Sequence, residues 1–93
     1  MIVAIMRVHF NFATGAERER GRILRSAVDR LRARKIYSVA NVTDHADAYS
    51  GEIGIAYIGT SVPDADAALD TALQLLERVE AIIVDVEREI TRF

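Results

Sequence analysis

Arginine is the residue type in this sequence whose number and spacing point most clearly to a chemistry. The stretch ERERGRILRSAVDRLRARK, residues 17–35, holds eight of the twelve Lys and Arg residues of the 93-residue chain. With three acidic residues its net charge is +5, whereas the rest of the chain, with four basic and eleven acidic residues, carries −7. Guanidinium groups bind phosphate oxygens through paired hydrogen bonds. The stretch is therefore either a surface that binds a polyanion or the solvated face of a structural helix.

The same stretch is predicted to form an amphipathic helix. At 100° per residue, with Leu24 at zero, its apolar side chains gather on one side of the helix. These are Ile23, Leu24, Ala27, Val28 and Leu31. Four arginines fall between about 80° and 160°, on the solvent side. They are Arg18, Arg22, Arg25 and Arg32. Such a ridge can follow a nucleic-acid backbone by charge and shape, so these four are the candidates for phosphate or RNA binding.

An alternative interpretation is that these arginines are partnered within the chain. Acidic residues three or four positions away can pair with them, Glu19 with Arg22, and Asp29 with Arg25 and Arg32. A second expected helix has an acidic flank, which would neutralise the arginines if the two flanks faced each other. That flank consists of Asp66, Asp70 and Glu77. Three arginines lack a local partner: Arg18, Arg30 and Arg34. They favour phosphate binding, and both interpretations stay open.

Other residue types offer little chemistry. The segment DHAD, residues 44–47, combines two carboxylates and one imidazole, but metal sites need three or four converging ligands, so a polar turn explains it better. The glycines of SGEIGIAYIG lack a phosphate-loop spacing, and Gly54 and Gly59 are expected at bulges or close contacts. There is no cysteine, and no nucleophile, base and orienting residue can be assembled from their spacing. We expect no enzyme activity, catalytic residue, cofactor or metal.

Hydrophobic periodicity places strands and helices around the arginine stretch. Apolar residues alternate over 2–12, which predicts a strand, and Thr14 is a candidate cap for the helix that follows, with Glu17 as the acid of a capping box. β-Branched and aromatic residues predict strands at 36–43 and 52–59, joined as a hairpin by a short polar loop.

The remaining third of the chain is predicted to form a helix and a strand. Pro63 suits the first turn of a helix that ends near Val79 and buries one apolar stripe. The stripe consists of Leu69, Ala72, Leu73, Leu76 and Val79. Alternation over 82–90 predicts a last strand. Its apolar side consists of Ile82, Val84, Val86 and Ile90. The order βαββαβ predicts an α+β, ferredoxin-like fold, a four-stranded antiparallel sheet with two helices on one face, as a single domain over residues 1–93.

The outer face of this sheet is expected to be charged at one end and apolar at the other. Arg7 and His9 would face carboxylates of the last strand in cross-strand charge pairs. Those carboxylates are Asp85, Glu87 and Glu89. Base stacking on the sheet needs exposed aromatic residues, so that mode of RNA binding is not expected. Val3 and Ile5 form an apolar patch that favours a homo-oligomer, in the first place a dimer through the outer sheet face.

Several segments together resemble a known family. They are RILRSAVDRLRAR followed by YSVANV, then IGIAYIG, and VDVEREI near the end. This arrangement is similar to the YlxP-like bacterial family, domain of unknown function 503. The resemblance implies a ferredoxin-like, usually oligomeric protein, with genes near those for translation initiation and ribosome maturation. Three positions depart from the family pattern, because acids dilute the basic run at 17–22, Asn41 replaces a glutamate, and Ala48 and Tyr49 occupy the place of a tryptophan.

Composition agrees with a folded cytoplasmic domain. The chain is 51% hydrophobic and 28% charged with one proline, which is typical of a globular protein. No signal peptide or membrane-spanning run is expected. The sequence thus predicts a non-enzymatic binding module that docks on RNA through its first helix, and the family resemblance implies rRNA or a ribosomal particle as the partner. Two alternatives are a regulatory domain that binds a protein partner and a sensor that binds a small ligand between subunits.

Overall fold

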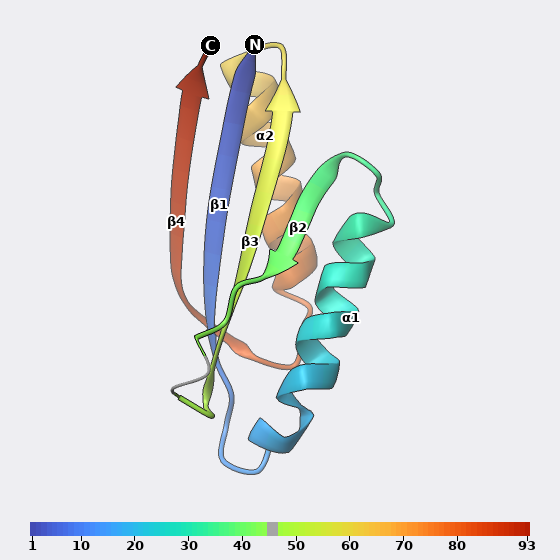
Figure 1. Ribbon diagram of the computed structural model, residues 1–93, viewed down its shortest axis with the longest axis vertical. Coiled ribbons are helices and arrows are strands. Elements are labelled where there is room, and N and C mark those ends of the chain that lie inside the picture. Colours follow the sequence, from blue (N-terminus) through green and yellow to red (C-terminus); the bar gives the residue numbers. More distant parts are fainter. Residues whose placement is uncertain (45–46) are drawn as a thin grey trace.

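A computed structural model of the chain describes residues 1–44 and 47–93. It contains four strands and two long helices in the order β1, α1, β2, β3, α2, β4 (Figure 1). The strands are β1 (Ile2–Asn11), β2 (Tyr37–Asn41), β3 (Ser50–Gly59) and β4 (Ile82–Arg92). The helices are α1 (Arg20–Arg32) and α2 (Val62–Leu76), with a 3₁₀ turn, Glu17–Glu19, before α1. No helix of the described part is long and apolar enough to cross a bilayer.

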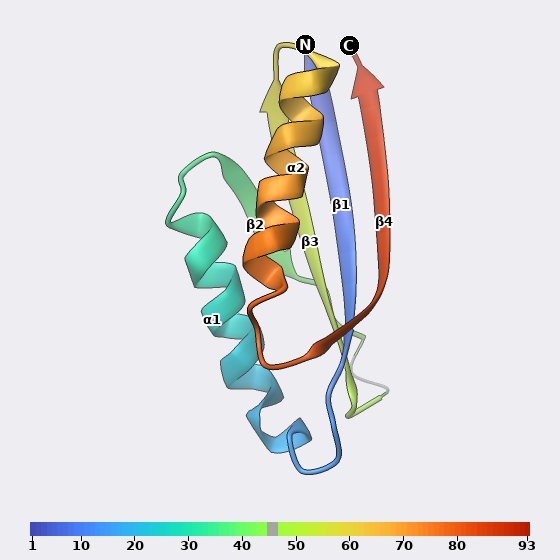
Figure 2. The ribbon, with the colours of Figure 1, turned by 180° about the vertical axis from the view of Figure 1, so that it is seen from behind.

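All neighbouring strands are antiparallel, in the spatial order β2, β3, β1, β4. Both helices lie on one face of this sheet, and the view from behind shows them in front of the strands (Figure 2). Helix α1 packs mainly on β2, and α2 packs on β1 and β3. The two ends of the chain meet, because Met1 and Phe93 pair through their backbones. The ferredoxin-like prediction is confirmed, and the opposite face of the sheet is left open.

The core lies between the sheet and the two helices. It takes the even residues of β1 from Ile2 to Phe10 and the predicted apolar stripe of α1, all of which are buried. On α2 the buried residues are Ala65, Ala68, Leu69, Ala72 and Leu76, whereas Leu73 and Val79 of the predicted stripe are half-buried. Tyr37 is also buried, and its hydroxyl donates to the backbone oxygen of Ala68 across 2.6 Å. Tyr37 therefore serves packing.

The two helices begin differently from each other. Helix α2 begins as the sequence predicts, with Pro63 in its first turn, and the hydroxyl of Ser61 accepts a hydrogen bond from the amide of Asp64 at 3.2 Å. The predicted cap at Thr14 is wrong. The chain enters α1 through the 3₁₀ turn without a side-chain cap, and the carboxylate of Glu17 accepts from the amide of Gly15.

A β-bulge changes the start of β4. The pairing of β1 with β4 shifts between His9 and Phe10, so that Ile83 pairs with Phe10 and faces the core side. Ile82 and Val84, predicted on the core side, are instead 62% and 53% exposed. The alternation after the bulge, with Val86 and Ile90 half-buried, follows the prediction. No residue of β4 is fully buried, so this edge strand depends on its pairing with β1.

Candidate functional site

The structure divides the four predicted phosphate-binding arginines into two groups. Arg18 and Arg25 are exposed and have no ion pair or hydrogen bond with any described residue. Arg22 donates to Glu19 at 2.7 Å, as predicted, and lies 3.6 Å from Glu80, which follows α2. The hydrogen bond to Glu19 raises the pKa of Arg22 further. Arg22 is therefore a paired cation, whereas Arg18 and Arg25 are available to an external anion.

Arg32 has a structural contact that its helical position did not indicate. Its guanidinium donates to the backbone oxygen of Val39 in β2 at 2.8 Å, and so it satisfies a carbonyl on the edge strand of the sheet. Arg20 acts similarly, because it donates to the backbone oxygens of Asp47 and Ser50. Both side chains tie α1 to the β2–β3 side of the molecule. Arg32 is thus a poor member of a phosphate-binding set.

Two further arginines belong with the free group. Arg30 and Arg34 are exposed and make no ion pair within the described residues. The sequence predicted that Asp29 pairs with Arg25 and Arg32. The structure describes all three residues, and no ion pair joins Asp29 to either arginine. We call Arg18, Arg25, Arg30 and Arg34 the free arginines. Arg25 and Arg30 lie on α1, which is about 20 Å long at 1.5 Å per residue over its 13 residues, and Arg18 and Arg34 lie just beyond its two ends.

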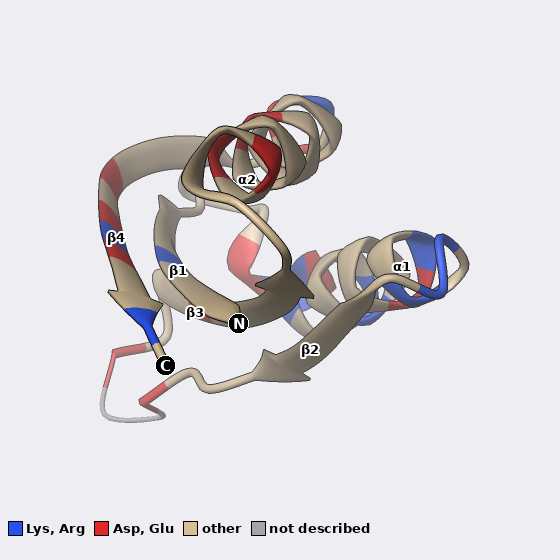
Figure 3. Ribbon diagram, turned by 90° about the horizontal axis from the view of Figure 1, so that it is seen from above, with Lys and Arg blue, Asp and Glu red and all other residues tan. Residues whose placement is uncertain are grey.

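The acidic flank of α2 does not cover the arginines. Figure 3 shows basic residues gathered on α1 and acidic residues on α2 and β4, in separate parts of the molecule. Asp70 pairs with Arg88 of β4 at 2.7 Å, and the described structure gives Asp66 and Glu77 no ion pair. The contact between Arg22 and Glu80 is the single described ion pair from α1 to the region after α2. Among the described ion pairs, none joins an arginine of α1 to the predicted acidic flank, and the contact of Arg22 is with Glu80, outside that flank.

The charged end of the outer sheet face is centred on a residue that the sequence did not single out. Glu52 of β3, with a side chain only 15% exposed, lies 3.0 Å from Arg7 Nε and 3.1 Å from His9 Nε2. The predicted cross-strand partner Glu87 is also present, 3.6 Å from Arg7 and 3.4 Å from His9. The sequence could have indicated Glu52, because it lies on the outward side of a strand that pairs with β1.

The apolar end of the same face is exposed, as predicted. Ile5 is 45% exposed and Ile58, on the neighbouring strand β3, is 65% exposed, while Val3 is half-buried. A shallow hollow of about 420 Å³ lies between this end and the charged end and is lined by both kinds of residue. Its lining includes Ile5, Val42, Arg7 and Glu87. The face thus offers both apolar and charged contacts.

The DHAD segment behaves as turn chemistry where it is described. The carboxylate of Asp47 accepts a hydrogen bond from the amide of Tyr49 at 2.8 Å. His45 lies outside the described residues. The backbone at Gly59 is closely approached by another residue, as predicted, because a Cβ added there would lie 2.4 Å from the carboxylate of Asp64. At Gly54 an added Cβ would meet Val42 at an ordinary 3.6 Å.

Comparison with protein families gives one match that spans most of the chain. The model of the family described as Protein of unknown function (DUF503) matches residues 3–88. The chain belongs to this family. The predicted resemblance to the domain of unknown function is therefore confirmed. No curated protein shows significant sequence similarity to this DUF503 chain.

Solved structures share the fold of this DUF503 chain at low sequence identity. A Pseudomonas aeruginosa protein, PA3566, has 18% identity and a TM-score of 0.65, with 98% of this chain and 93% of that chain covered. Rv0793 from Mycobacterium tuberculosis has 18% identity and a TM-score of 0.59, with coverage of 99% and 94%. An antibiotic biosynthesis monooxygenase has 17% identity and a TM-score of 0.55, with coverage of 100% and 98%. At such identities these likenesses show the ferredoxin-like fold alone.

Proposed function

We propose that this DUF503 protein is a non-enzymatic binding module whose helix α1 docks on the phosphate backbone of structured RNA, with a ribosomal particle as the source of that RNA. The observation that carries the proposal is the set of free arginines. Four guanidinium groups are exposed along α1 and its two ends, and none forms an ion pair or hydrogen bond with a described residue. Unpaired guanidinium groups bind phosphate without first breaking an internal ion pair.

The charge distribution supports contact with phosphates instead of bases. Acidic residues are concentrated on α2 and β4, away from α1, so a polyanion would be oriented with α1 toward it (Figure 3). The outward residues of β1 are Val3, Ile5, Arg7, His9 and Asn11, which offer no aromatic ring for base stacking. Because α1 would contact the phosphate backbone, it would recognise the charge and shape of an RNA, and so we expect little sequence preference.

The proposal is tested by co-sedimentation with ribosomal subunits over a series of salt concentrations. Four phosphate contacts give a log-log salt slope of about −3 to −3.5, at 0.7 to 0.9 per contact. The double variant Arg18→Gln/Arg25→Gln removes two free arginines and lowers the magnitude of this slope by about 1.5. Arg78→Gln/Arg92→Gln is the matched control, because it makes the same change in net charge at exposed residues outside α1.

The results separate the two interpretations of the arginine stretch. If the control double variant binds like the unaltered protein while Arg18→Gln/Arg25→Gln binds more weakly, α1 is the RNA-binding element. Equal losses in both variants would mean that only net charge matters. If the unaltered protein does not sediment with either subunit at low salt, the proposal is wrong, and α1 is a solvated structural helix.

A second function is favoured by the exposed apolar end of the outer sheet face. We propose that the chain forms a dimer by packing this face on the same face of a second copy. The four strands contain 10, 5, 10 and 11 residues, and at about 3.4 Å per residue and about 4.8 Å between strands they make a face of roughly 600 Å². That area approaches the roughly 800 Å² that each partner buries in a stable interface. Ile5 and Ile58 lie diagonally on the neighbouring strands β1 and β3, where Ile58 pairs with Val3, and both side chains are exposed in the described structure.

Sedimentation equilibrium tests the dimer. We expect Ile58→Lys to yield a monomer, because two-fold packing places each introduced charge in an apolar interface. Ile36→Lys is the control, since Ile36 is similarly exposed but precedes β2 and lies outside the sheet face. A monomer in the unaltered protein at high concentration would refute the dimer, and then a thermal-shift screen with small metabolites tests the open hollow as a ligand site.

A further inference from the structure

The imidazole of His9 has an unusual environment on the outer sheet face. Its Nε2 atom is buried and forms no hydrogen bond with the described residues, although Glu52 Oε1 lies 3.1 Å away and Glu87 Oε1 lies 3.4 Å away. The distances are short, but the angles are unsuitable for a hydrogen bond. A buried imidazole nitrogen without a hydrogen bond, close to two carboxylate oxygens, is a place where a positive species would be stabilised.

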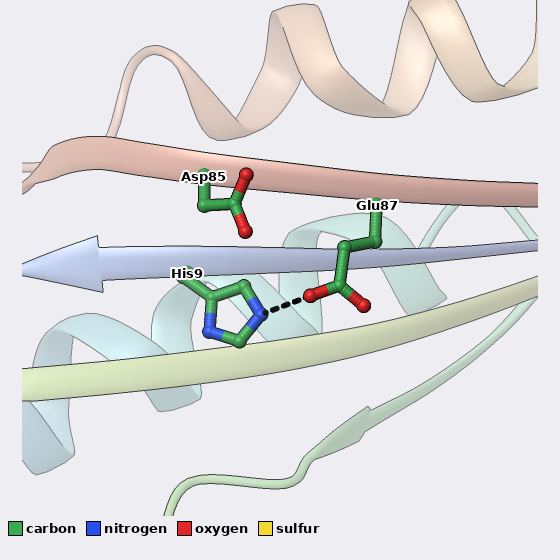
Figure 4. Close-up of side chains that lie close together, drawn as sticks. All are labelled: His9, Asp85 and Glu87. Carbon is green, nitrogen blue, oxygen red and sulfur yellow. Dashed lines mark ion pairs between the residues drawn. The ribbon is translucent and has the colours of Figure 1, made fainter.

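A third carboxylate completes the cluster. His9, Asp85 and Glu87 each offer one ligand atom, and these atoms all lie within 4.8 Å of one another (Figure 4). Ligand atoms about 2.1 Å from a tetrahedral zinc ion are separated by about 3.4 Å. The Nε2 of His9 and Oε1 of Glu87 already have this separation, at 3.4 Å. The geometry therefore approaches that of a metal site without rearrangement of the backbone.

The pairing of two strands fixes these ligands. Asp85 is the register partner of His9, and Glu87 is the register partner of Arg7, so all three candidate ligands point outward from adjacent strands. Arg7 Nη1 lies 3.6 Å from Oε2 of Glu87, while Oε1 of the same carboxylate lies 3.4 Å from His9 Nε2. The arginine thus orients the carboxylate in the way that outer partners orient metal ligands.

Charge and access also suit a cation. The cluster contains three carboxylates, from Glu52, Asp85 and Glu87, against one guanidinium from Arg7, a balance of −2 when His9 is neutral. A divalent cation would neutralise this charge of −2. A hollow of about 300 Å³ lies on the His9 and Glu52 side of the cluster, with Thr43 and Ser50 among its lining residues. On the other side Asp85 and Glu87 are themselves exposed, so water reaches the cluster there.

We propose that His9, Asp85 and Glu87 bind a divalent transition-metal ion that bridges β1 and β4, with water in the remaining position and Glu52 beside it. One imidazole with carboxylates suits zinc or manganese better than calcium or magnesium, which prefer oxygen ligands alone. The bridge would secure β4, the edge strand that has no fully buried residue. The inference does not depend on RNA binding or on dimer formation.

Zinc binding is measured by isothermal titration calorimetry and by thermal unfolding, in a His45→Ala background that removes the other imidazole of the chain. We expect one zinc ion per chain and a higher midpoint of unfolding with zinc than without it. His9→Gln and Asp85→Asn are each expected to weaken zinc binding by at least about tenfold. Glu89→Gln is the control, because Glu89 is an outward carboxylate of the same strand that pairs with Ile5, outside the cluster.

Several outcomes would overturn the inference. Absence of zinc and manganese binding would refute it, and so would binding that His9→Gln leaves unchanged. Histidine NMR provides a readout independent of stability, since bound zinc shifts the His9 Nε2 resonance, whereas Glu89→Gln should leave that response intact. If the ring responds to acid alone and not to zinc, the positive species beside the carboxylates is a proton, and the metal site is wrong.

Discussion

Replacing Arg32 distinguishes a structural arginine from the free arginines beside it. In Arg32→Met the alkyl chain stays, but the guanidinium that donates to the oxygen of Val39 is lost. Arg30→Met is the matched control, because Arg30 lies in the same last turn of α1 and has no described partner. Both variants remove one positive charge near the C-terminal end of the helix, so the helix dipole affects them alike.

The expected magnitude follows from that contact. A hydrogen bond from a charged group contributes about 1.5 to 3 kcal/mol when buried, and the contact to Val39 is only partly buried, so we expect a loss of about 1 kcal/mol. With a urea dependence of roughly 1 to 2 kcal/mol per M, the midpoint of unfolding falls by about 0.5 to 1 M. In Arg30→Met the free energy of unfolding should stay within about 0.5 kcal/mol of the unaltered protein.

Urea unfolding followed by circular dichroism measures both variants, and RNA co-sedimentation gives the complementary result. Arg30→Met should weaken RNA binding and leave stability unchanged, while Arg32→Met should lower stability and affect RNA binding less. Equal unfolding midpoints in the two variants would refute the structural role of Arg32. A larger loss of RNA binding in Arg32→Met would return this residue to the phosphate-binding set.

Three further predictions concern packing and pH. Gly59→Ala should destabilise the protein by about 1 to 3 kcal/mol in urea unfolding, because the added Cβ would meet the carboxylate of Asp64. Gly21→Ala, whose added Cβ meets no atom within 4 Å, should instead stabilise the protein by up to about 1 kcal/mol through α1. Tyr37→Phe removes a buried hydrogen bond and should cost about 1 kcal/mol by the same assay. Burial raises the pKa of Tyr37, and the hydrogen bond to Asp64 raises the pKa of Tyr57. Both tyrosines therefore contribute stability that is present below pH 10 and is lost as the pH rises through their folded-state pKa values. Absorbance titration of tyrosine in the folded protein measures these pKa values.

The sequence predicted the element order and the core face of most elements. The alternation of β1 and the helical spacing of α1 depend on side chains two to four residues apart, and the backbone geometry of each element sets those relations. The bulge between His9 and Phe10 was not predictable in this way. It depends on how β4 meets β1, and it turned Ile82 and Val84 outward.

The candidate site was less predictable than the fold. Local spacing correctly paired Glu19 with Arg22, because both lie on neighbouring turns. It missed Arg32, whose acceptor belongs to β2, and Glu52, whose two partners belong to β1. In each case the partner comes from another element, so no window of sequence contains the contact.

The sequence by itself determined that this chain forms a ferredoxin-like sheet covered by two helices and that its positive charge lies on the first helix. Hydrophobic period and charge composition suffice for that, since they act through neighbours along the chain. Only the tertiary structure decided which arginines remain free and which carboxylates meet His9. Strand register and helix docking bring together residues that are distant in sequence, and those contacts decide whether a charged side chain has an internal partner or faces an external ligand.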